Sequence, residues 1–194
     1  MASSKRDQLI DTAQRLFYQH GFRATGIDAV LAESGVAKKT LYNHFKSKEE
    51  LIIATLTRRD QQFMDLLQAE VKRLTSKQDC APQLAPIMAF FDGLNHWINS
   101  DSFFGCMFIN ASAEYPRHND PVHITCATHK EQVINFIEDL LSDLQLNHSA
   151  AIARQLSILV DGAIVGAHTT GDYHSPLDAK AIAQVILTAH LQLA

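Results

Sequence analysis

The chain has 194 residues, of which 46% are hydrophobic and 20% are charged, and its formal net charge is -4. These values are ordinary for a soluble globular protein and exclude a disordered or low-complexity chain. No stretch approaches about 18 uncharged apolar residues, and the N-terminus lacks the apolar run of a signal peptide, so we expect a cytoplasmic protein with no membrane partner. Three cysteines at wide spacings indicate reduced thiols rather than a disulfide framework.

Charge is distributed unevenly along the chain. Residues 1–48 hold eight Lys and Arg against four Asp and Glu, a balance of +4, so the remainder carries -8. A basic segment joined to an acidic body is typical of a DNA-binding domain fused to a domain with another role. We predict one domain over 1–47 and a second over 48–194.

The first domain shows the spacing of three short helices. The first helix is marked by apolar residues on one face, Leu9, Ile10, Ala13, Leu16 and Phe17. It stops at Gly21, and Thr25 is the expected cap of a second helix that stops at Gly35. A third helix over 38–45 places Leu41 inward. Two short helices around a tight glycine turn predict a helix-turn-helix.

The remaining chain predicts longer helices and no strand. Ser47 and Glu50 form a capping box, and the apolar pattern after it continues to about residue 76 without a breaker. Further helices are expected at about 83–99, 104–115, 121–145, 149–170 and 176–193. Asp120-Pro121 and Ser175-Pro176 match a cap followed by proline at the first helical position. The predicted fold class is all-α, with about nine helices.

Residues 21–30 and 34–51 carry a resemblance to a known family. The most specific part, residues 40–51 with Thr-Leu-Tyr-x-His-Phe-x-Ser-Lys-Glu-x-Leu, resembles the N-terminal signature of the tetracycline-repressor (TetR/AcrR) family. The resemblance covers roughly the first 55 residues. It implies a transcription regulator, most often a repressor, that leaves a palindromic operator when a small effector binds. It also implies a C-terminal domain for effector binding and dimerisation.

Matched position by position, the family pattern places seven residues at double-stranded operator DNA: Thr25, Lys38, Lys39, Thr40, Tyr42, His44 and Lys48. Lys38, Lys39 and Thr40 are expected near base edges or adjacent phosphates, and the other four at the DNA backbone. Lysine can bond guanine O6 or N7, and a threonine methyl can touch a thymine methyl.

Alternatives without DNA contact exist for several of these residues. Tyr42 can pack beside Phe45, Lys48 can be a solvated helix start, and Thr25 can act chiefly as a cap. The chain departs from the family pattern at Ala37, where Ser is frequent, and at Lys39, where Gly is frequent. Ala37 removes a hydroxyl that could hold a phosphate, and Lys39 adds a charge that can replace it.

The last two predicted helices are rich in Ala, Ile, Leu and Val, and Gly162 and Gly166 allow close approach. By the family resemblance they pair with their copies in a four-helix bundle, which gives a homodimer with two DNA-reading heads. The alternative is that they are buried only within their own subunit.

An aromatic and sulfur-rich stretch precedes these helices, and its apolar walls suit a small hydrophobic or aromatic effector of unknown identity. The predicted ligand-binding residues are Phe91, Trp97, Phe104, Met107, Phe108, Asn110 and His168. Aromatic residues at helical spacing also fit an ordinary core.

Cys106 is a candidate redox sensor. Phe104 to Met107, with Ala111 to Glu114, resembles a Gly-Cys…Ser-Ala-Glu segment in the family branch that contains the N-ethylmaleimide-reductase repressor, an electrophile sensor. A thiol at a helix N-terminus can have a lowered pKa, which is the property a sensor needs. The alternative is a buried cysteine that acts as a small hydrophobic residue.

Other classes of site are not expected. His123, Cys126 and His129 recur every three residues, but that spacing drifts by about 60° per step around a helix, so we expect no metal site. Motifs such as GxSxG, GxGxxG, the P-loop and HExxH do not occur, so we expect neither an enzyme nor a cofactor. A helical ligand-binding or interaction module with no DNA role is the remaining alternative.

Overall fold

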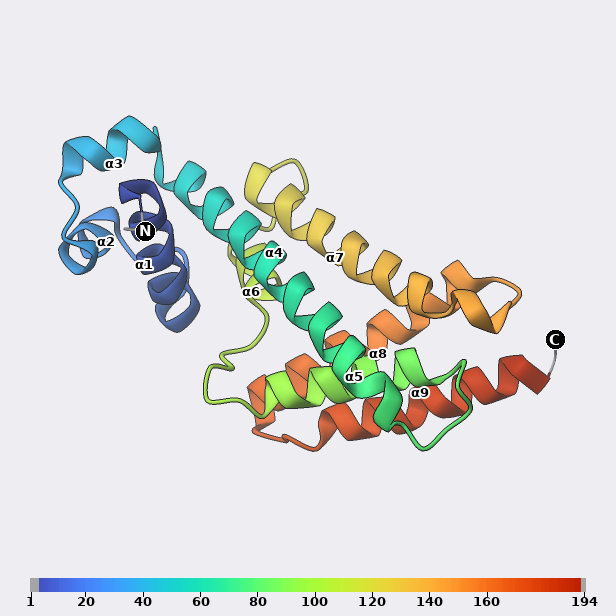
Figure 1. The fold of residues 1–194 in the computed structure, drawn as a ribbon. Helices are drawn as coiled ribbons and strands as arrows, with labels where there is room; N and C mark the ends of the chain where they lie inside the picture. The colour runs from blue at the N-terminus through green and yellow to red at the C-terminus, as the bar shows by residue number, and fades with distance from the viewer. Residues whose placement is uncertain (1–3, 193–194) are drawn as a thin grey trace. The chain divides into compact units, whose positions relative to one another are not determined.

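The computed structural model describes residues 4–192, and all regular secondary structure in this part of the chain is helical (Figure 1). Its nine α-helices are α1 (Lys5–His20), α2 (Ile27–Ser34), α3 (Lys38–His44), α4 (Lys48–Leu74), α5 (Ala85–Ile98), α6 (Met107–Glu114), α7 (Pro121–Leu140), α8 (Ser149–Thr170) and α9 (Ser175–Gln192). Two 3-10 turns, η1 (Thr75–Lys77) and η2 (Ser142–Leu144), follow α4 and α7. The predicted all-α class is confirmed.

Several helix ends form where the sequence predicts them. Gly35 ends α2 at φ 65°, a left-handed conformation that suits glycine. At the start of α4 the Ser47 hydroxyl accepts the Glu50 N–H at 3.2 Å, and the Glu50 carboxylate accepts the Lys46 N–H at 2.7 Å. The capping box is therefore present, with its return bond one residue earlier than in the usual pattern.

Two predicted caps and one helix end are wrong. Gly26 is the N-cap of α2, because the Thr25 hydroxyl donates instead to the carbonyl of Gly21 at 2.8 Å. Ser175 is the first residue of α9 and not its cap, and its hydroxyl lies within hydrogen-bond distance of two carbonyls, that of Asp172 at 2.8 Å and that of Ala163 in α8 at 2.9 Å. The helix expected to reach residue 145 ends as α7 at Leu140, and η2 follows it.

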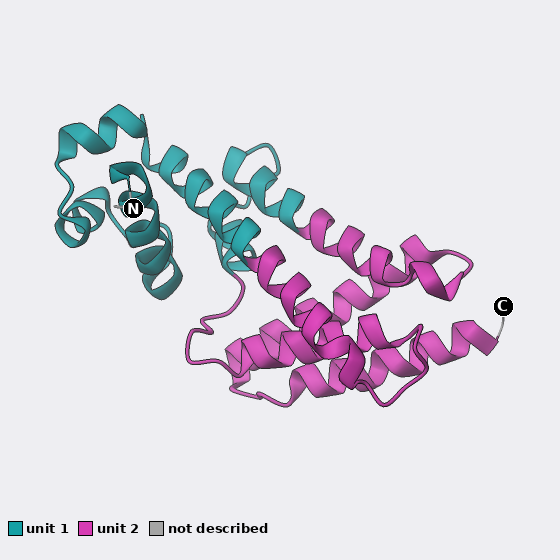
Figure 2. Ribbon diagram, in the orientation of Figure 1, with its two compact units in different colours: residues 1–62, 107–129 teal, residues 63–106, 130–194 magenta. Residues whose placement is uncertain are grey.

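The chain divides into two compact units (Figure 2). Unit 1 comprises residues 1–62 and 107–129, and unit 2 comprises residues 63–106 and 130–194. The predicted domain boundary after residue 47 falls at the start of α4, within unit 1. We use the term reading head for α1, α2 and α3, which all belong to unit 1.

The apolar face of α1 forms part of the core of unit 1. The five residues predicted for that face are all buried: Leu9, Ile10, Ala13, Leu16 and Phe17. Phe22 stacks on Phe17 with ring centroids 5.2 Å apart, and Val30 of α2 and Leu41 of α3 are fully buried. Burying a side chain of this size stabilises the fold by about 1.5–3 kcal/mol, so the three short helices depend on this shared core.

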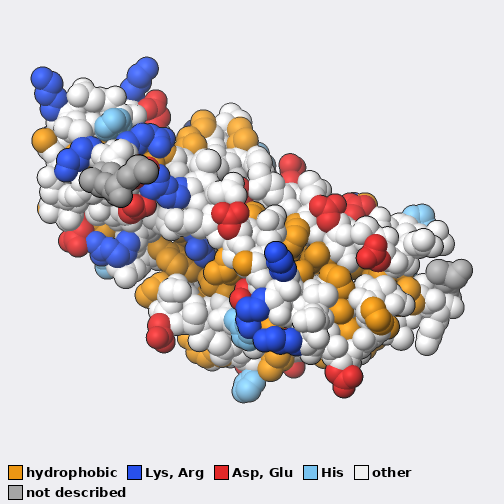
Figure 3. Space-filling view, in the orientation of Figure 1, with side chains coloured by type: hydrophobic (Ala, Val, Ile, Leu, Met, Phe, Trp, Pro, Cys, Tyr) orange, Lys and Arg blue, Asp and Glu red, His pale blue; other side chains and the backbone are white. Residues whose placement is uncertain are grey.

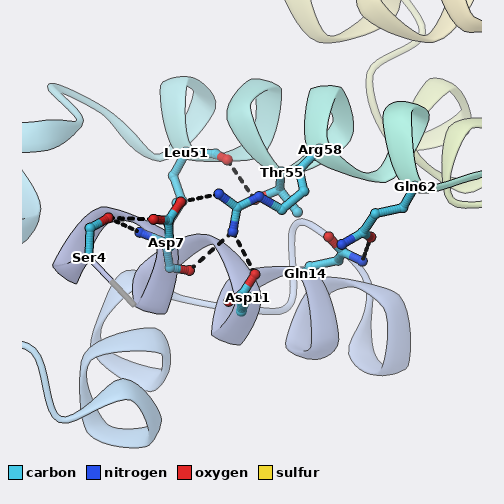
Figure 4. Close-up of polar contacts among 8 residues, drawn as sticks. All are labelled: Ser4, Asp7, Asp11, Gln14, Leu51, Thr55, Arg58 and Gln62. Carbon is cyan, nitrogen blue, oxygen red and sulfur yellow. Dashed lines mark hydrogen bonds and ion pairs between the residues drawn. The ribbon is translucent and has the colours of Figure 1, made fainter. Parts of the chain in front are cut away.

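Polar contacts also hold α1 to α4 (Figure 4). The Arg58 guanidinium donates to the carboxylate of Asp7 and, at 2.6 Å, to that of Asp11. Further along the same two helices, Gln14 Nε2 donates to Gln62 Oε1 at 2.8 Å. The Ser4 hydroxyl and then Arg58 hold the pKa of Asp7 below its ordinary value. These contacts fix α1 against α4 within unit 1.

In unit 2, α5 packs against α8 and α9, and most of its side chains are buried. A polar network joins α5 and α9 to the residue that follows η1. Lys180 of α9 donates to Asp92 Oδ1 at 2.6 Å, and Gln78, just after η1, donates to Asp92 Oδ2 at 2.7 Å. Because every partner is hydrogen-bonded, this network fits a half-buried position without an unpaired charge.

Among the described residues, α8 alone is long and apolar enough to cross a membrane by length and composition, with a mean hydropathy of 1.4 over its most apolar window. Of that window, 44% is buried inside the protein. The core helix of a soluble protein has the same length and composition, so this feature is weak evidence for a membrane span.

Candidate DNA-reading site

The second helix, the turn and the third helix of the reading head form as the sequence predicts. The Gly35 N–H donates to the carbonyl of Leu31 at 3.0 Å and closes α2. Val36 in the turn, Leu41 in α3 and Phe45 just after α3 are all buried. Because the inward face of α3 is filled by these side chains, its other face is turned to solvent.

The solvent face of α3 carries five exposed polar or aromatic side chains: Lys38, Lys39, Tyr42, Asn43 and His44. Tyr42 is 47% exposed, so packing beside the buried Phe45 does not account for it. Thr40 is half-buried at the edge of this face. The Lys38 ammonium lies 3.5 Å from the Asp28 carboxylate, but both side chains are so exposed that this ion pair contributes little stability.

The other two predicted DNA contacts, Thr25 and Lys48, point toward the protein. Thr25 is 4% exposed, and its hydroxyl proton is used on Gly21. Its side chain therefore supports the turn and does not join the solvent face of α3. The Lys48 ammonium donates to the carbonyl of Arg23 at 3.2 Å, and burial lowers its pKa. This bond uses one of the three N–H donors of the ammonium.

Positive side chains gather over the reading head, as the blue atoms in Figure 3 show. The exposed Lys and Arg residues of this region are Lys5, Arg6, Arg15, Arg23, Lys38, Lys39 and Lys46. Arg15 is paired with Glu33 at 2.6 Å, and both partners are exposed. A concentration of basic side chains around a short polar helix is the electrostatic pattern that binds the DNA backbone.

The turn between α1 and α2 is held by α6 and α4. Glu114, the last residue of α6, accepts the N–H of Phe22 at 2.9 Å and the N–H of Arg23 at 2.6 Å, one on each carboxylate oxygen. The guanidinium of Arg23 lies 5.6 Å from the ring centroid of Tyr115. The sequence does not predict this contact, because the partners of Glu114 lie about 90 positions away along the chain. The only local sign of Glu114 is that it ends the Ser-Ala-Glu segment noted above.

A buried polar pair joins α4 and α7 within unit 1. His129 is 3% exposed, and its Nδ1 lies 2.6 Å from the Asp60 carboxylate. The Phe108 ring stacks on the His129 ring with centroids 3.5 Å apart. His129 is thus a hydrogen-bonded core residue. Within the described residues, no group of three or more His, Cys, Asp and Glu is placed to hold a metal ion.

Four of the predicted ligand-binding residues belong to unit 2. Trp97 is buried, and its ring lies roughly perpendicular to the Phe103 ring with centroids 5.1 Å apart. The His168 ring is also roughly perpendicular to that of Phe103, with centroids 6.3 Å apart. Phe104 is 40% exposed, whereas Phe91 is fully buried. Trp97 and His168 are therefore brought together through Phe103, and Phe91 occupies an ordinary core position.

The other three belong to unit 1, on α6. Met107 and Phe108 are buried, and Asn110 is half-buried.

Cys106, the candidate redox sensor, directly precedes the first residue of α6, so its thiol is at a helix N-terminus as predicted, but it is only 6% exposed. A Cβ on its neighbour Gly105 would lie 2.9 Å from the His168 ring, so the chain next to Cys106 is tightly packed.

A second surface of interest lies on α8 and α9 of unit 2. Half of the exposed large hydrophobic residues found in the described chain lie on these two helices: Ile158, Val165, Leu177, Ile182 and Val185. Ile158 and Val185 are 70% and 69% exposed. An open groove of about 440 Å³ follows one face of α9 from Ala181 to Gln192. Apolar side chains gathered on a surface in this way are typical of a protein interface.

Comparison with known proteins identifies the chain. The profile of the family described as "Bacterial regulatory proteins, tetR family" matches residues 9–55, which contain α2, α3 and most of α1. The crystal structure of SCO4454, a TetR-family transcriptional regulator from Streptomyces coelicolor, has a TM-score of 0.83 and 29% identity over 96% of both chains. The chain belongs to the TetR family. The resemblance carried by residues 21–51 is therefore confirmed.

Relatives of this TetR-family chain are named as transcription regulators. The transcriptional activator FasR of Mycolicibacterium smegmatis is 37% identical over 94 residues, which are 47% of this chain and 41% of FasR. The regulator YjdC of Escherichia coli is 22% identical over 160 residues, which are 82% of this chain and 81% of YjdC. The chain is a DNA-binding transcriptional regulator of the TetR family, a family of regulatory proteins and not of enzymes.

Proposed function

We propose that this regulator binds a palindromic operator as a homodimer and represses transcription until a small hydrophobic or aromatic effector releases it. The observation that carries the DNA half of the proposal is the solvent face of α3. Lys38, Lys39 and Thr40 are positioned to reach base edges from a helix in the major groove, and Tyr42 and His44 to reach phosphates. Lys48 reaches a phosphate with the N–H donors that Arg23 leaves free, whereas Thr25 supports the turn.

The dimer half of the proposal rests on the exposed apolar face of α8 and α9. Two copies of this face packed together form a four-helix bundle that buries Ile158 and Val185. A twofold dimer carries two reading heads, and two heads match a palindrome. The alternative, in which these helices are buried only within their own subunit, leaves both residues in water.

The effector half rests on the aromatic residues of the C-terminal domain, which we assign to 48–194. Trp97, Phe104 and His168 offer apolar walls and one polar ring, and we keep Phe91, Met107, Phe108 and Asn110 as further proposed contacts. A ligand that binds one conformation of the dimer better than another shifts the operator affinity by that difference. We place the protein in the cytoplasm, where its DNA lies.

A thiol-sensing repressor that uses Cys106 is the alternative mode of release. The position of Cys106 just before α6 favours thiol sensing, and the burial of its side chain opposes thiol sensing. In either mode the DNA half of the proposal is the same.

Selection of bound sequences from random duplex DNA at fixed salt tests the DNA half. Wild type is compared with a Lys39→Ala, Tyr42→Ala double variant, and Lys72→Ala, an exposed lysine of α4 in unit 2, is the matched control. Losing a bidentate base contact costs about 1–3 kcal/mol, and losing a phosphate contact lowers the salt slope by about 1. We expect wild type and Lys72→Ala to enrich a palindrome that the double variant does not.

Enrichment of a site without twofold symmetry would contradict the dimeric reader. No enrichment by folded wild type would remove the proposed reading of a palindromic operator. For the effector half, apolar compounds that raise the melting temperature are added to the operator complex. If such a compound binds tightly and the operator affinity does not change, the proposal that an effector releases the operator is wrong.

A further inference from the structure

The reading head is joined to α6 through one carboxylate. Glu114 uses both oxygens, Oε1 on the N–H of Phe22 at 2.9 Å and Oε2 on the N–H of Arg23 at 2.6 Å. Hydrogen bonds from amides to a carboxylate are shorter and about twice as strong as those between neutral groups. Two of them on consecutive residues fix the direction of the chain where it leaves α1.

The surroundings of this contact leave the turn little freedom. Gly21 has φ +86°, and a Cβ at this position would lie 3.2 Å from Glu114 Oε1. The carbonyl of Arg23 accepts from Lys48, the first residue of α4. The N–H groups of Phe22 and Arg23 are therefore held by α6 and the carbonyl of Arg23 by α4, all within unit 1.

We propose that Glu114 is the positioning residue through which α6 sets the α1–α2 turn, and with it α2 and α3, for operator binding. This inference rests on the proposed function. α6 follows directly in the chain on residues 103–106, so a change in that segment enters α6 at its first turn and reaches the head through Glu114. Since hydrogen bonds weaken steeply with distance and angle, a small displacement of α6 is sufficient to release the turn.

The sign of the effect separates positioning from electrostatics. Glu114 is a negative charge beside a basic head, and removing it strengthens attraction to phosphates if charge alone matters. Positioning predicts the opposite, because the turn loses the contact that orders it. Weaker operator binding by a variant that lacks the negative charge of Glu114 is therefore explained by positioning and not by electrostatics.

The test uses the full chain and the operator duplex obtained by the selection above. The variants are Glu114→Ala and Glu114→Gln, and Glu33→Ala is the control, because it removes an exposed carboxylate of the head that forms an exposed ion pair with Arg15. Operator affinity is measured at several salt concentrations. Amide hydrogen exchange of residues 21–26 and 107–114 is measured with and without the operator.

We expect Glu114→Ala to bind the operator at least about fivefold more weakly, the lower end of typical coupling between sites, with the salt slope unchanged. Glutamine keeps one acceptor, so Glu114→Gln should lie between Glu114→Ala and wild type. Glu33→Ala should bind as wild type does or more tightly. Operator should slow exchange in residues 107–114 of wild type and should not do so in Glu114→Ala, because coupling is reciprocal.

Wild-type affinity in Glu114→Ala, or exchange in α6 that still responds to operator, would overturn the inference and leave the DNA function intact. If Glu114→Ala does not fold, as judged by circular dichroism, Glu114→Gln decides by the same two measurements. Wild type that binds no selected duplex would remove the proposed function itself, which is a different result from a variant that binds normally.

Discussion

The reading head and the C-terminal helices of unit 2 expose opposite kinds of side chain. The solvent face of α3 is polar and basic around Tyr42, whereas α8 and α9 expose Ile158, Val185 and other apolar residues. Polar side chains on a helix surface form hydrogen bonds with water, and DNA can replace that water. Exposed aliphatic side chains lower the free energy only when another apolar surface covers them and removes them from water. The difference fits the two partners proposed above, DNA for the reading head and a second copy of the chain for the apolar face of α8 and α9.

The largest effect is expected from a charge placed on the apolar face. Ile158→Asp should convert the proposed dimer to monomers, as measured by sedimentation equilibrium, because a buried unpaired carboxylate is costly in the proposed interface. Operator affinity should fall by about 100-fold or more, since linked heads gain roughly that much over single ones. Ile124→Asp on α7, where the isoleucine is 50% exposed, is the control and should stay dimeric. A dimeric Ile158→Asp variant would place the interface elsewhere.

A pair of neighbours in α3 separates folding from DNA reading. Leu41 is fully buried, so Leu41→Ala should lower the free energy of unfolding by about 2–5 kcal/mol. Tyr42→Ala should change it by less than about 0.5 kcal/mol while it weakens operator binding. Urea denaturation measures the first quantity and operator titration the second. Equal destabilisation by both variants would mean that Tyr42 is structural.

A smaller effect is expected at an ion pair of unit 2. Arg73, and then His96, bond Glu70 and lower its pKa from 4.5 to about 2. Because the folded-state pKa is lowered, the stabilisation is present above about pH 4.5 and is lost as the pH falls toward 2. Glu70→Gln should therefore cost up to about 1 kcal/mol near neutral pH and nothing near pH 2, as followed by urea denaturation. A cost that is independent of pH would exclude this charge as its cause.

The smallest effect is expected at Cys106. Cys80 is half-buried, whereas Cys106 and Cys126 are buried, so iodoacetamide should modify Cys80 first, as peptide mass spectrometry would show. Brief treatment should leave operator binding unchanged in wild type and in Cys106→Ala. Loss of binding in wild type that Cys106→Ala prevents would favour the thiol-sensing alternative.

Local patterns predict the reading head well because its structure depends on neighbours in the chain. The spacing of Leu41 and Phe45 fixes which side of α3 faces inward, and so which side exposes Tyr42. The capping box at Ser47 and the glycine at position 35 act over three or four residues, which is the range that a sequence displays.

Contacts that form only in the folded turn, or between segments distant in the chain, are not predictable from local patterns. The hydroxyl of Thr25 has nearby N–H groups that it could cap, but the folded turn offers it the carbonyl of Gly21 instead. The pair of His129 with Asp60 and the bonds of Glu114 join residues that only the tertiary fold brings together. Among the predicted ligand residues, composition alone does not separate Trp97, which meets Phe103, from Phe91 in the core.

The contact of Glu114 with backbone N–H groups has a consequence for evolution. A carboxylate that bonds the main chain does not specify the side chains at positions 22 and 23, so a substitution there requires no compensating change at position 114. The constraint falls on position 21, where a methyl group would crowd Glu114 Oε1 and the positive φ already disfavours it. Among relatives that keep the contact, glycine at position 21 and an acidic residue at position 114 should therefore be inherited together.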